Sequence, residues 1–182
     1  RVLGEHTDGL DALLGQARRE QAATVALDGD GRGLDEIPGL AGTSWPHQRA
    51  GYWWARERSS ALLAFRMRYG KTRVAIGLAQ GLQRVLVVCP LSVVGVWPAE
   101  FDKHAPGVAR EVVALDRGSV TDKRARAAYG LEQARNHERP LVVVVNFDSA
   151  RMAPLSDWLL AQQWDMGVLD ESHRIKAPGG AT

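Results

Sequence analysis

Leu62-Leu-Ala-Phe-Arg-Met-Arg-Tyr-Gly-Lys-Thr72 is the stretch that decides the fold class of this 182-residue chain. Its apolar beginning predicts a strand over Leu62–Phe65, and Gly70-Lys71-Thr72 directly precedes a predicted helix. Backbone N–H groups at a helix start bind phosphates, a lysine reaches the outer phosphates and a hydroxyl can ligate Mg²⁺. The strict phosphate-loop pattern also has a glycine where this chain has Phe65, so the pattern is incomplete here.

Short apolar runs alternate with amphipathic stretches from Ser60 onward. This alternation is typical of βαβ units in a parallel sheet. The run Leu141–Val145 has no polar alternation, so we expect a central strand covered on both faces. The predicted fold class is α/β, a mostly parallel sheet with helices on both faces. The predicted strands are Leu62–Phe65, Val85–Cys89, Val112–Leu115, Leu141–Val145 and Met166–Leu169, and the predicted helices cover residues 72–83, 92–104, 121–137 and 155–162.

The first 40 residues differ in character from the rest of the chain. Apolar residues at helical spacing predict a helix from Thr7 to Ala26, and the Gly- and Asp-rich segment after it is typical of a linker. We therefore expect an appended helix and linker over residues 1–40 and an α/β domain over residues 41–182. Because the chain begins without Met, we expect a fragment or a processed product.

The composition is that of an ordinary globular protein, with 45% hydrophobic and 24% charged residues. No stretch approaches the roughly 20 apolar residues that cross a bilayer, and the single cysteine, Cys89, cannot form a disulfide within the chain. We therefore expect a cytoplasmic protein without a membrane partner. Between Trp45 and Arg84 there are eight basic residues and one acidic residue, Glu57. This basic block is a candidate site for a polyanion.

Two adjacent carboxylates, Asp170 and Glu171, follow the predicted strand Met166–Leu169. A phosphate-loop enzyme needs such groups at a strand end, because a carboxylate holds Mg²⁺ and another group positions the attacking water. Asp170 suits the metal and Glu171 the water. An isolated Asp-Glu pair is more often an ordinary solvated turn, but its combination with Gly70-Lys71-Thr72 favours a nucleotide site.

Five segments, in order along the chain, carry a resemblance to a known family. Trp45-Pro-His-Gln-Arg-Ala-Gly-Tyr-Trp-Trp54 resembles the glutamine-bearing motif that precedes the phosphate loop in Swi/Snf-type ATPases of helicase superfamily two. Ala64–Thr72 resembles their motif I, and Val88–Phe101 resembles motif Ia. Val145-Asn-Phe-Asp-Ser149 resembles motif Ib, and Asp170-Glu-Ser-His-Arg-Ile-Lys176 resembles motif II.

The resemblance implies that residues 41–182 form the first RecA-like lobe of an ATP hydrolase that uses Mg²⁺. It makes Lys71 and Glu171 catalytic, with Lys71 on the β- and γ-phosphates and Glu171 at the attacking water. Thr72 and Asp170 are then the Mg²⁺ ligands. The implied nucleotide-binding residues, with Gln48 at the adenine edge, are Gln48, Met67, Arg68, Tyr69, Gly70, Lys71, Thr72 and Arg73.

The resemblance also implies partners. Pro90, Leu91, Ser92 and Asn146 are expected near the phosphates of a nucleic acid, with double-stranded DNA as the expected partner. His173 is expected to couple the nucleotide state to the rest of the protein. The other implied partner is a second RecA-like lobe in the same full-length chain, and no protein partner is specified. The implied location is the nucleoid in a bacterial or viral setting and the nucleus in a eukaryote.

Three functions stay open at this stage. The first is a lobe of an ATP-dependent double-stranded DNA translocase, and the second is an unwinding helicase or a restriction-type motor subunit. The third is a DNA-binding module with a decayed ATPase, which is raised by Arg68, since most relatives have glycine there. We expect the fragment alone to hydrolyse ATP weakly or not at all, because arginines of a second lobe would be needed to stabilise the transition state.

Overall fold

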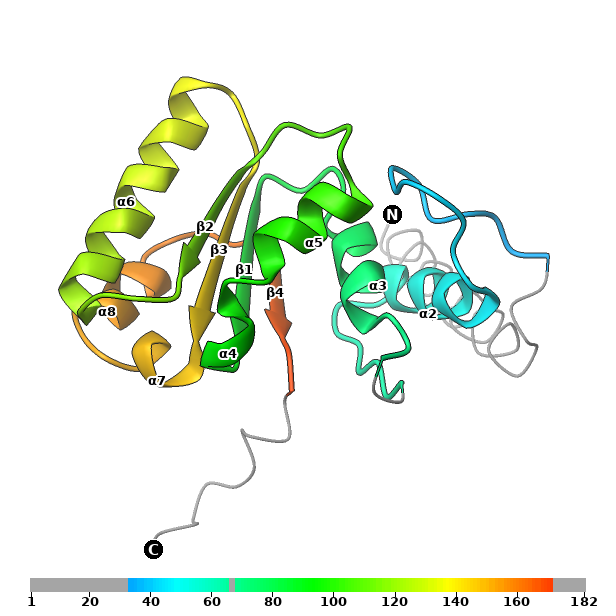
Figure 1. Ribbon diagram of the computed structural model, residues 1–182, viewed down its shortest axis with the longest axis horizontal. Helices are drawn as coiled ribbons and strands as arrows, with labels where there is room; N and C mark the ends of the chain where they lie inside the picture. The colour runs from blue at the N-terminus through cyan, green and yellow to red at the C-terminus, as the bar shows by residue number, and fades with distance from the viewer. Residues whose placement is uncertain (1–32, 66–67, 172–182) are drawn as a thin grey trace, which may run out of the picture. The chain divides into compact units, whose positions relative to one another are not determined.

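The computed structural model describes residues 33–65 and 68–171 (Figure 1). The chain forms two compact units, one that ends at Gln80 and one that begins at Gly81. Each unit has its own buried apolar cluster. The helix predicted from Thr7 to Ala26 lies outside the described residues.

The first unit is built on two helices, α2 (Pro46–Arg56) and α3 (Lys71–Leu78). Pro46 is the first residue of α2, where its fixed φ suits the helix and its missing N–H group is not needed. Tyr52 of α2 and Val74 of α3 are buried together with Ile37 from the preceding segment. The helix predicted over residues 72–83 is confirmed, although it ends earlier, at Leu78.

The strand predicted over Leu62–Phe65 is wrong, because residues 61–65 belong to no helix or strand. Leu62 is 72% exposed, whereas Leu63 and Phe65 pack against the buried cluster of the first unit. The Phe65 ring lies so close to Gly51 of α2 that a Cβ on Gly51 would overlap it. The apolar run therefore belongs to an extended segment that packs on a helix, and no described strand pairs with it.

The second unit contains a four-stranded sheet with the order β2-β3-β1-β4. All three neighbouring pairs are parallel, as the alternating pattern predicted. Every residue of β3 is buried, which confirms the prediction of a central strand. The strands are β1 (Arg84–Cys89), β2 (Glu111–Leu115), β3 (Leu141–Asn146) and β4 (Met166–Leu169).

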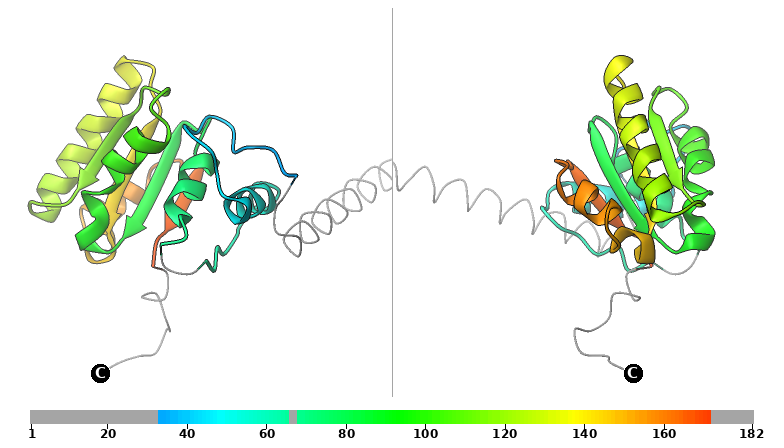
Figure 2. Two further views of the ribbon diagram at one scale, coloured as in Figure 1. Left: turned by 45° about the vertical axis from the view of Figure 1, so that its right-hand side comes forward. Right: turned by 90° about the vertical axis from the view of Figure 1, so that its left-hand side faces the viewer.

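Helices cover both faces of this sheet (Figure 2). On one face, α6 (Val120–Asn136) and α8 (Leu155–Leu160) share a buried cluster with β1, β2 and β3. On the other face lie α4 (Leu91–Val94) and α5 (Trp97–His104). The single helix predicted over residues 92–104 is thus two helices. Pro98 is the reason, because it has no N–H group to donate to the carbonyl four residues earlier, at Val94.

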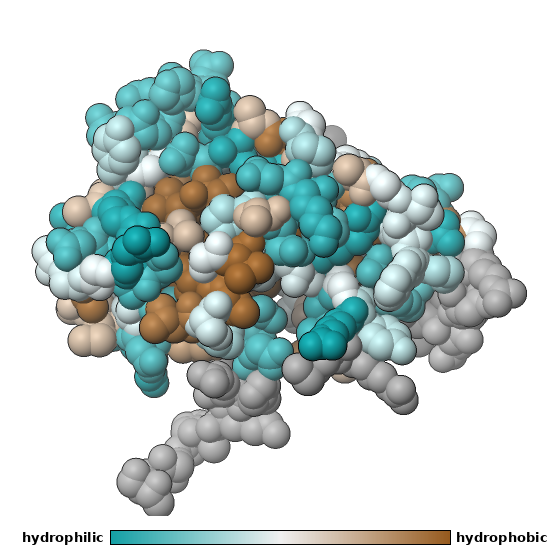
Figure 3. Space-filling view, in the orientation of Figure 1, coloured by the Kyte–Doolittle hydropathy of each residue, from teal (hydrophilic) through white to brown (hydrophobic). Residues whose placement is uncertain are grey.

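Apolar side chains gather on the surface of the second unit around β2 and α4 (Figure 3). Leu91 and Val96 are 54% and 48% exposed there. In the part of the chain that the structure describes, no helix is both long and apolar enough to cross a membrane.

Candidate functional site

Gly70 forms the turn into α3, and its φ of 75° is a left-handed conformation that favours glycine. The first intrahelical hydrogen bond of α3 runs from the Val74 N–H to the Gly70 carbonyl, at 3.3 Å. The N–H groups of Lys71, Thr72 and Arg73 therefore come before the first intrahelical bond. Such N–H groups, together with the positive end of the helix dipole, attract anions.

Lys71 and Thr72 are both half-buried at the beginning of α3. The Lys71 ammonium donates a hydrogen bond to the Phe65 carbonyl at 3.0 Å, so it lies beside the segment that leads to Gly70. Arg68, in the same segment, has a φ of 64°. This is the left-handed region, in which a residue with a Cβ is strained.

Gln48 connects α2 to the segment that leads to Gly70. Its Oε1 accepts a hydrogen bond from the Trp45 N–H at 3.0 Å, and its Nε2 donates to the Tyr69 carbonyl at 3.3 Å. Nε2 of His47 lies 3.0 Å from the same carbonyl oxygen. Gln48 is only 6% exposed, so the amide that was expected at an adenine edge is already held by backbone groups of its own unit.

Exposed aromatic rings surround this connection. Trp45 is 57% exposed and Tyr69 is 43% exposed. Both rings contact His47: the Trp45 ring centroid lies 5.6 Å from the His47 centroid, and the Tyr69 ring centroid lies 5.2 Å from it. This grouping could not be predicted from the sequence, because Trp45 and Tyr69 are far apart along the chain.

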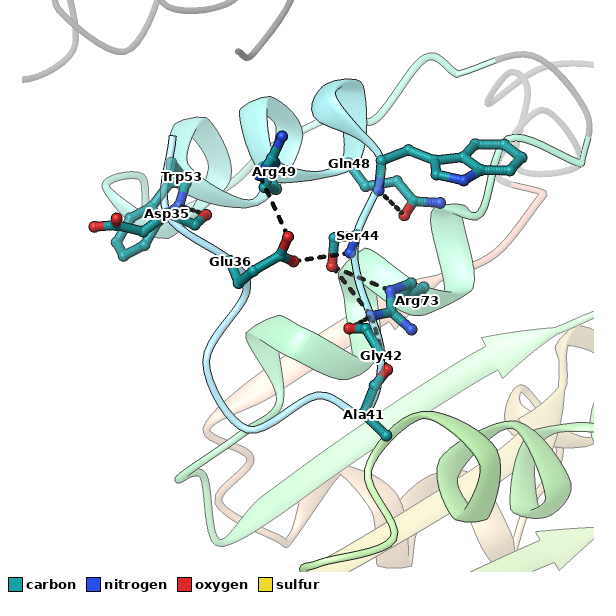
Figure 4. Close-up of polar contacts among 10 residues, drawn as sticks. Asp35, Glu36, Ala41, Gly42, Ser44, Gln48, Arg49, Trp53 and Arg73 are labelled. Atoms are coloured by element: carbon teal, nitrogen blue, oxygen red, sulfur yellow. Dashed lines mark hydrogen bonds and ion pairs between the residues drawn. The ribbon is translucent and has the colours of Figure 1, made fainter. Parts of the chain in front are cut away.

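Arg73 has a structural role that its position beside Lys71-Thr72 did not suggest. Its side chain is buried and its Nε donates to the Ser44 hydroxyl at 3.2 Å. Its Nη2 donates to the carbonyls of Ala41 at 2.9 Å and Gly42 at 2.8 Å (Figure 4). Glu36 holds the same segment, residues 41–44, by accepting a hydrogen bond from the Ser44 N–H at 2.8 Å. The guanidinium thus holds residues 41–44 against α3, and the backbone N–H of Arg73 belongs to the first turn of the helix.

Other members of the basic block also have partners inside the first unit. Arg49 pairs with Glu36 at 3.3 Å. Arg56 stacks over the Trp53 ring at 5.2 Å, and Arg58 over the Trp54 ring at 4.3 Å. Part of the charge that predicted a polyanion site therefore packs on aromatic rings and a carboxylate of the same unit.

Asp170 and Glu171 follow β4 in the second unit. The Asp170 N–H donates to the Val88 carbonyl at 2.9 Å and so extends the pairing of β4 with β1. Burial, together with the charge of Asp170, raises the pKa of the Cys89 thiol to about 12, although a hydrogen bond with Trp97 acts in the opposite direction. Glu171 has a φ of 56°, which lies in the left-handed region and is strained for a residue with a Cβ.

A cavity of about 620 Å³ lies at the carboxyl end of the sheet. Ligands of open α/β sheets bind at this end of the strands. Pro90, Leu91 and Asn146, three of the four residues expected near a nucleic acid, line the cavity together with Arg151 and Leu169. Ser92, the fourth, is exposed but is not part of the lining.

Two expected site residues, Met67 and His173, lie outside the described residues. The Gly70 turn belongs to the first unit, and the Asp170-Glu171 pair belongs to the second. Within residues 33–65 and 68–171, no group of three or more His, Cys, Asp or Glu side chains could hold a metal ion. A site there would need other donors, such as a hydroxyl.

A parallel α/β sheet with helices on both faces, and a glycine turn that opens a helix after a glutamine-bearing helix, define a RecA-like ATPase lobe. This chain matches the family model of the SNF2-related domain over residues 14–181 and belongs to that family. The predicted fold class and the resemblance to Swi/Snf-type ATPases are thereby confirmed.

Individual relatives agree with this assignment. The chain is 31% identical over 158 residues to a probable global transactivator of Orgyia pseudotsugata multicapsid polyhedrosis virus. This match covers 80% of this chain and 30% of the viral protein. It is also 28% identical over 133 residues to the DNA excision repair protein ERCC-6-like of Mus musculus. That match covers 66% of this chain and 10% of the mouse protein. The chain therefore spans less than a third of the length of these relatives.

The fold also has a counterpart among solved structures. The Sulfolobus solfataricus SWI2/SNF2 ATPase core in complex with dsDNA matches with a TM-score of 0.59 and 26% identity. The match covers 80% of this chain and 29% of that one. The similarity therefore extends through most of this chain and concerns a part of the larger core.

Proposed function

We propose that this chain is the first RecA-like lobe of an ATP-dependent motor that moves along double-stranded DNA. The observation that carries the proposal is the family match over residues 14–181, together with the anion-binding turn at Gly70. The similar archaeal core was solved in complex with dsDNA, which supports DNA as the partner. We assign residues 41–182 to the lobe and residues 1–40 to an appended helix and linker.

ATP is the proposed substrate at the Gly70 turn. The first N–H groups of α3 and the Lys71 ammonium provide positive charge for the phosphates. The Gln48 amide donates a hydrogen bond to the Tyr69 carbonyl, next to the Gly70 turn. To contact adenine, the amide would have to give up this hydrogen bond and form one with the base. Glu171 is the proposed group that positions the attacking water.

The residues fit Mg²⁺ by the chemistry of their donors. Thr72 offers a hydroxyl and Asp170 a carboxylate, which are oxygen ligands of the kind that Mg²⁺ prefers. Magnesium usually keeps few protein ligands and completes its shell with water and phosphate oxygens, so a cluster of three carboxylates is not required. When bound, the ion would neutralise charge on the phosphates.

DNA is proposed to lie at the carboxyl end of the sheet in the second unit. Pro90, Leu91, Ser92 and Asn146 are the proposed contacts with its phosphates. A second RecA-like lobe, in the part of the full-length protein outside this chain, is proposed to supply the arginines that complete the catalytic site. His173 is proposed to couple nucleotide state to DNA contact.

The test is DNA-stimulated ATP hydrolysis by the full-length protein. Lys71→Ala and Glu171→Gln should each abolish turnover, because they remove a phosphate contact and the group at the water. Glu171→Gln should retain ATP binding, since it leaves the helix turn intact. Wild-type turnover in both variants would contradict the proposal, and residues 1–182 alone should turn over little.

Two further measurements separate the remaining alternatives. Displacement of one strand of a duplex during ATP hydrolysis would favour an unwinding helicase over a translocase. Calorimetry of the full-length protein with Mg²⁺ and ATP tests for a decayed site, for which no heat of binding would be detected. Arg68 makes this measurement necessary, because its φ of 64° places a strained residue in the turn segment.

A further inference from the structure

Lys123, in the first turn and a half of α6, is a buried cation with uncharged partners. It is only 5% exposed. Its ammonium donates to Oδ1 of Asn146 at 3.1 Å and to the Ser149 hydroxyl at 2.8 Å. Among the described residues, Lys123 takes part in no ion pair.

Burial of this charge is not explained by the stability of the fold. A buried ammonium group loses hydration, and neutral oxygens restore only part of the lost free energy. An apolar residue of the same length would fill the space next to β3 without this cost. A positive charge is therefore kept under Asn146 and Ser149 at an energetic cost to the second unit.

The contact with Lys123 fixes the orientation of the Asn146 amide. An ammonium group can only donate, so the amide oxygen must face Lys123 and the amide nitrogen must face the other way. Among the described residues, Nδ2 of Asn146 has no hydrogen-bond partner. It is not fully buried either, in contrast to Arg49 Nε, which is both buried and unpaired. Asn146 lines the cavity, so the cavity is a space that its N–H groups can reach.

Asn146 therefore presents a donor, with a positive charge behind it, to a cavity at the carboxyl end of the sheet. The positive charge polarises the amide, which makes the N–H groups stronger donors. A donor of this kind suits an anionic oxygen, and the rim carries one more cation, Arg151, which pairs with Asp148 at 2.8 Å.

We propose that Lys123 is a positioning residue for nucleic-acid binding: it holds the Asn146 amide so that its N–H donates to a backbone phosphate. The proposal rests on the proposed function, since it requires the carboxyl end of the sheet to contact DNA. It adds a residue of α6, far from the motifs that suggested DNA binding, and it assigns Asn146 one hydrogen bond of defined direction.

Two substitutions in the full-length protein separate the parts of this arrangement. Lys123→Met removes the ammonium and keeps the length of the side chain. Asn146→Asp keeps an oxygen for Lys123 and even adds a salt bridge, but replaces the donor with an anionic oxygen. Ser149→Ala is the matched control, because it removes the other partner of Lys123 and leaves the contact with Asn146.

The measurement is the Kd for a short DNA duplex by fluorescence anisotropy, at one fixed salt concentration, with the Kd for ATP measured in parallel. We expect about tenfold weaker DNA binding for Lys123→Met, as for loss of one charge-assisted hydrogen bond, and a larger loss for Asn146→Asp. Ser149→Ala should change the Kd by less than about threefold. The Kd for ATP should stay the same in all three variants.

A double-mutant cycle decides between positioning and a merely structural role. If Lys123 acts through Asn146, Lys123→Met should have no further effect in an Asn146→Ala background. Losses that add, or a Lys123→Met variant that binds DNA like wild type, would overturn the proposal. If Lys123→Met does not fold, Asn146→Asp still tests it, and unchanged DNA binding by that variant would overturn it. A wild-type protein that does not bind DNA would refute the proposed function as well, and so is distinguishable.

Discussion

A Cβ placed on Gly70 would overlap Nε2 of Gln48. This relationship joins two segments that sequence alone could only place in order, the glutamine-bearing helix and the phosphate-binding turn. The turn therefore depends on glycine for two reasons, its φ of 75° and the space taken by the Gln48 amide. Gln48 in turn holds the backbone of Tyr69, the residue before this glycine.

Gly70→Ala should destabilise the first unit and weaken ATP binding. The left-handed conformation costs a residue with a Cβ about 1–2 kcal/mol, and displacement of the Gln48 amide adds to this. We expect an unfolding free energy lower by about 2–3 kcal/mol and ATP binding weakened at least tenfold. Urea unfolding and calorimetry with ATP measure the two effects.

Gly81→Ala is the control for this prediction. Gly81 also has a left-handed φ, 82°, but nothing lies within 4 Å of an added Cβ. It should show only the conformational cost, about 1–2 kcal/mol. Equal losses in the two variants would show that the Gln48 amide moves away without penalty. They would contradict a steric requirement for glycine at position 70.

Arg73→Met should destabilise the first unit more than any exposed arginine does. The substitution leaves the Ser44 hydroxyl and the carbonyls of Ala41 and Gly42 without their donor. Loss of these contacts should lower the unfolding free energy by about 2–4 kcal/mol, because buried acceptors are left unpaired. Arg56→Met, which removes an exposed arginine over Trp53, should cost less than about 1 kcal/mol. Similar losses in the two variants would contradict a structural role for the Arg73 guanidinium.

The outcome at Arg73 shows what the sequence could and could not predict. The uninterrupted valines of β3 predicted a strand that is buried on both faces. The apolar runs of β1, β2 and β4 also predicted their strands within about a residue, although β2 and β4 are only partly buried. The run Leu62–Phe65 is apolar as well, yet it packs on α2 as an extended segment, since apolar periodicity reports burial and not the partner. Arg73 and Lys123 were hidden for a related reason, because composition predicts that cations lie on the surface.

The raised pKa of Cys89 predicts both low reactivity and a pH dependence. With a pKa of about 12 in the folded protein against an ordinary value near 9, the folded state keeps its proton where the unfolded state loses it. Stability should therefore be unaffected by this thiol below about pH 9 and should fall between about pH 9 and 12, by at most about 1.4 kcal/mol per pH unit.

The matched variant for the thiol is Cys89→Ala. It should lose some stability at every pH, because Cys89 is fully buried, but the additional fall from its titration above pH 9 should disappear. The measurement is urea unfolding of both proteins across this range, since other groups titrate equally in both. At pH 8 a disulfide reagent should modify wild type only after unfolding. A parallel fall in both proteins would show that Cys89 does not titrate as its surroundings require.

Arg68→Gly should stabilise the first unit and decide what the arginine contributes to nucleotide binding. Arg68 has a φ of 64°, so glycine removes a strain of about 1–2 kcal/mol, although its greater freedom in the unfolded chain returns about 0.4–1 kcal/mol. The net expectation is a gain of about 0.5–1 kcal/mol in unfolding free energy. Glu138→Gly is the control, because Glu138 has a similar φ of 52° in a turn after α6 and should gain a similar amount.

ATP binding then separates two explanations for an arginine at position 68. If the cation attracts the phosphates, Arg68→Gly should bind ATP more weakly in spite of its greater stability, and the difference should shrink as salt rises. If the strained turn limits binding instead, affinity should rise with stability, and Glu138→Gly should leave it unchanged. A destabilised Arg68→Gly variant would contradict the assignment of strain to this residue.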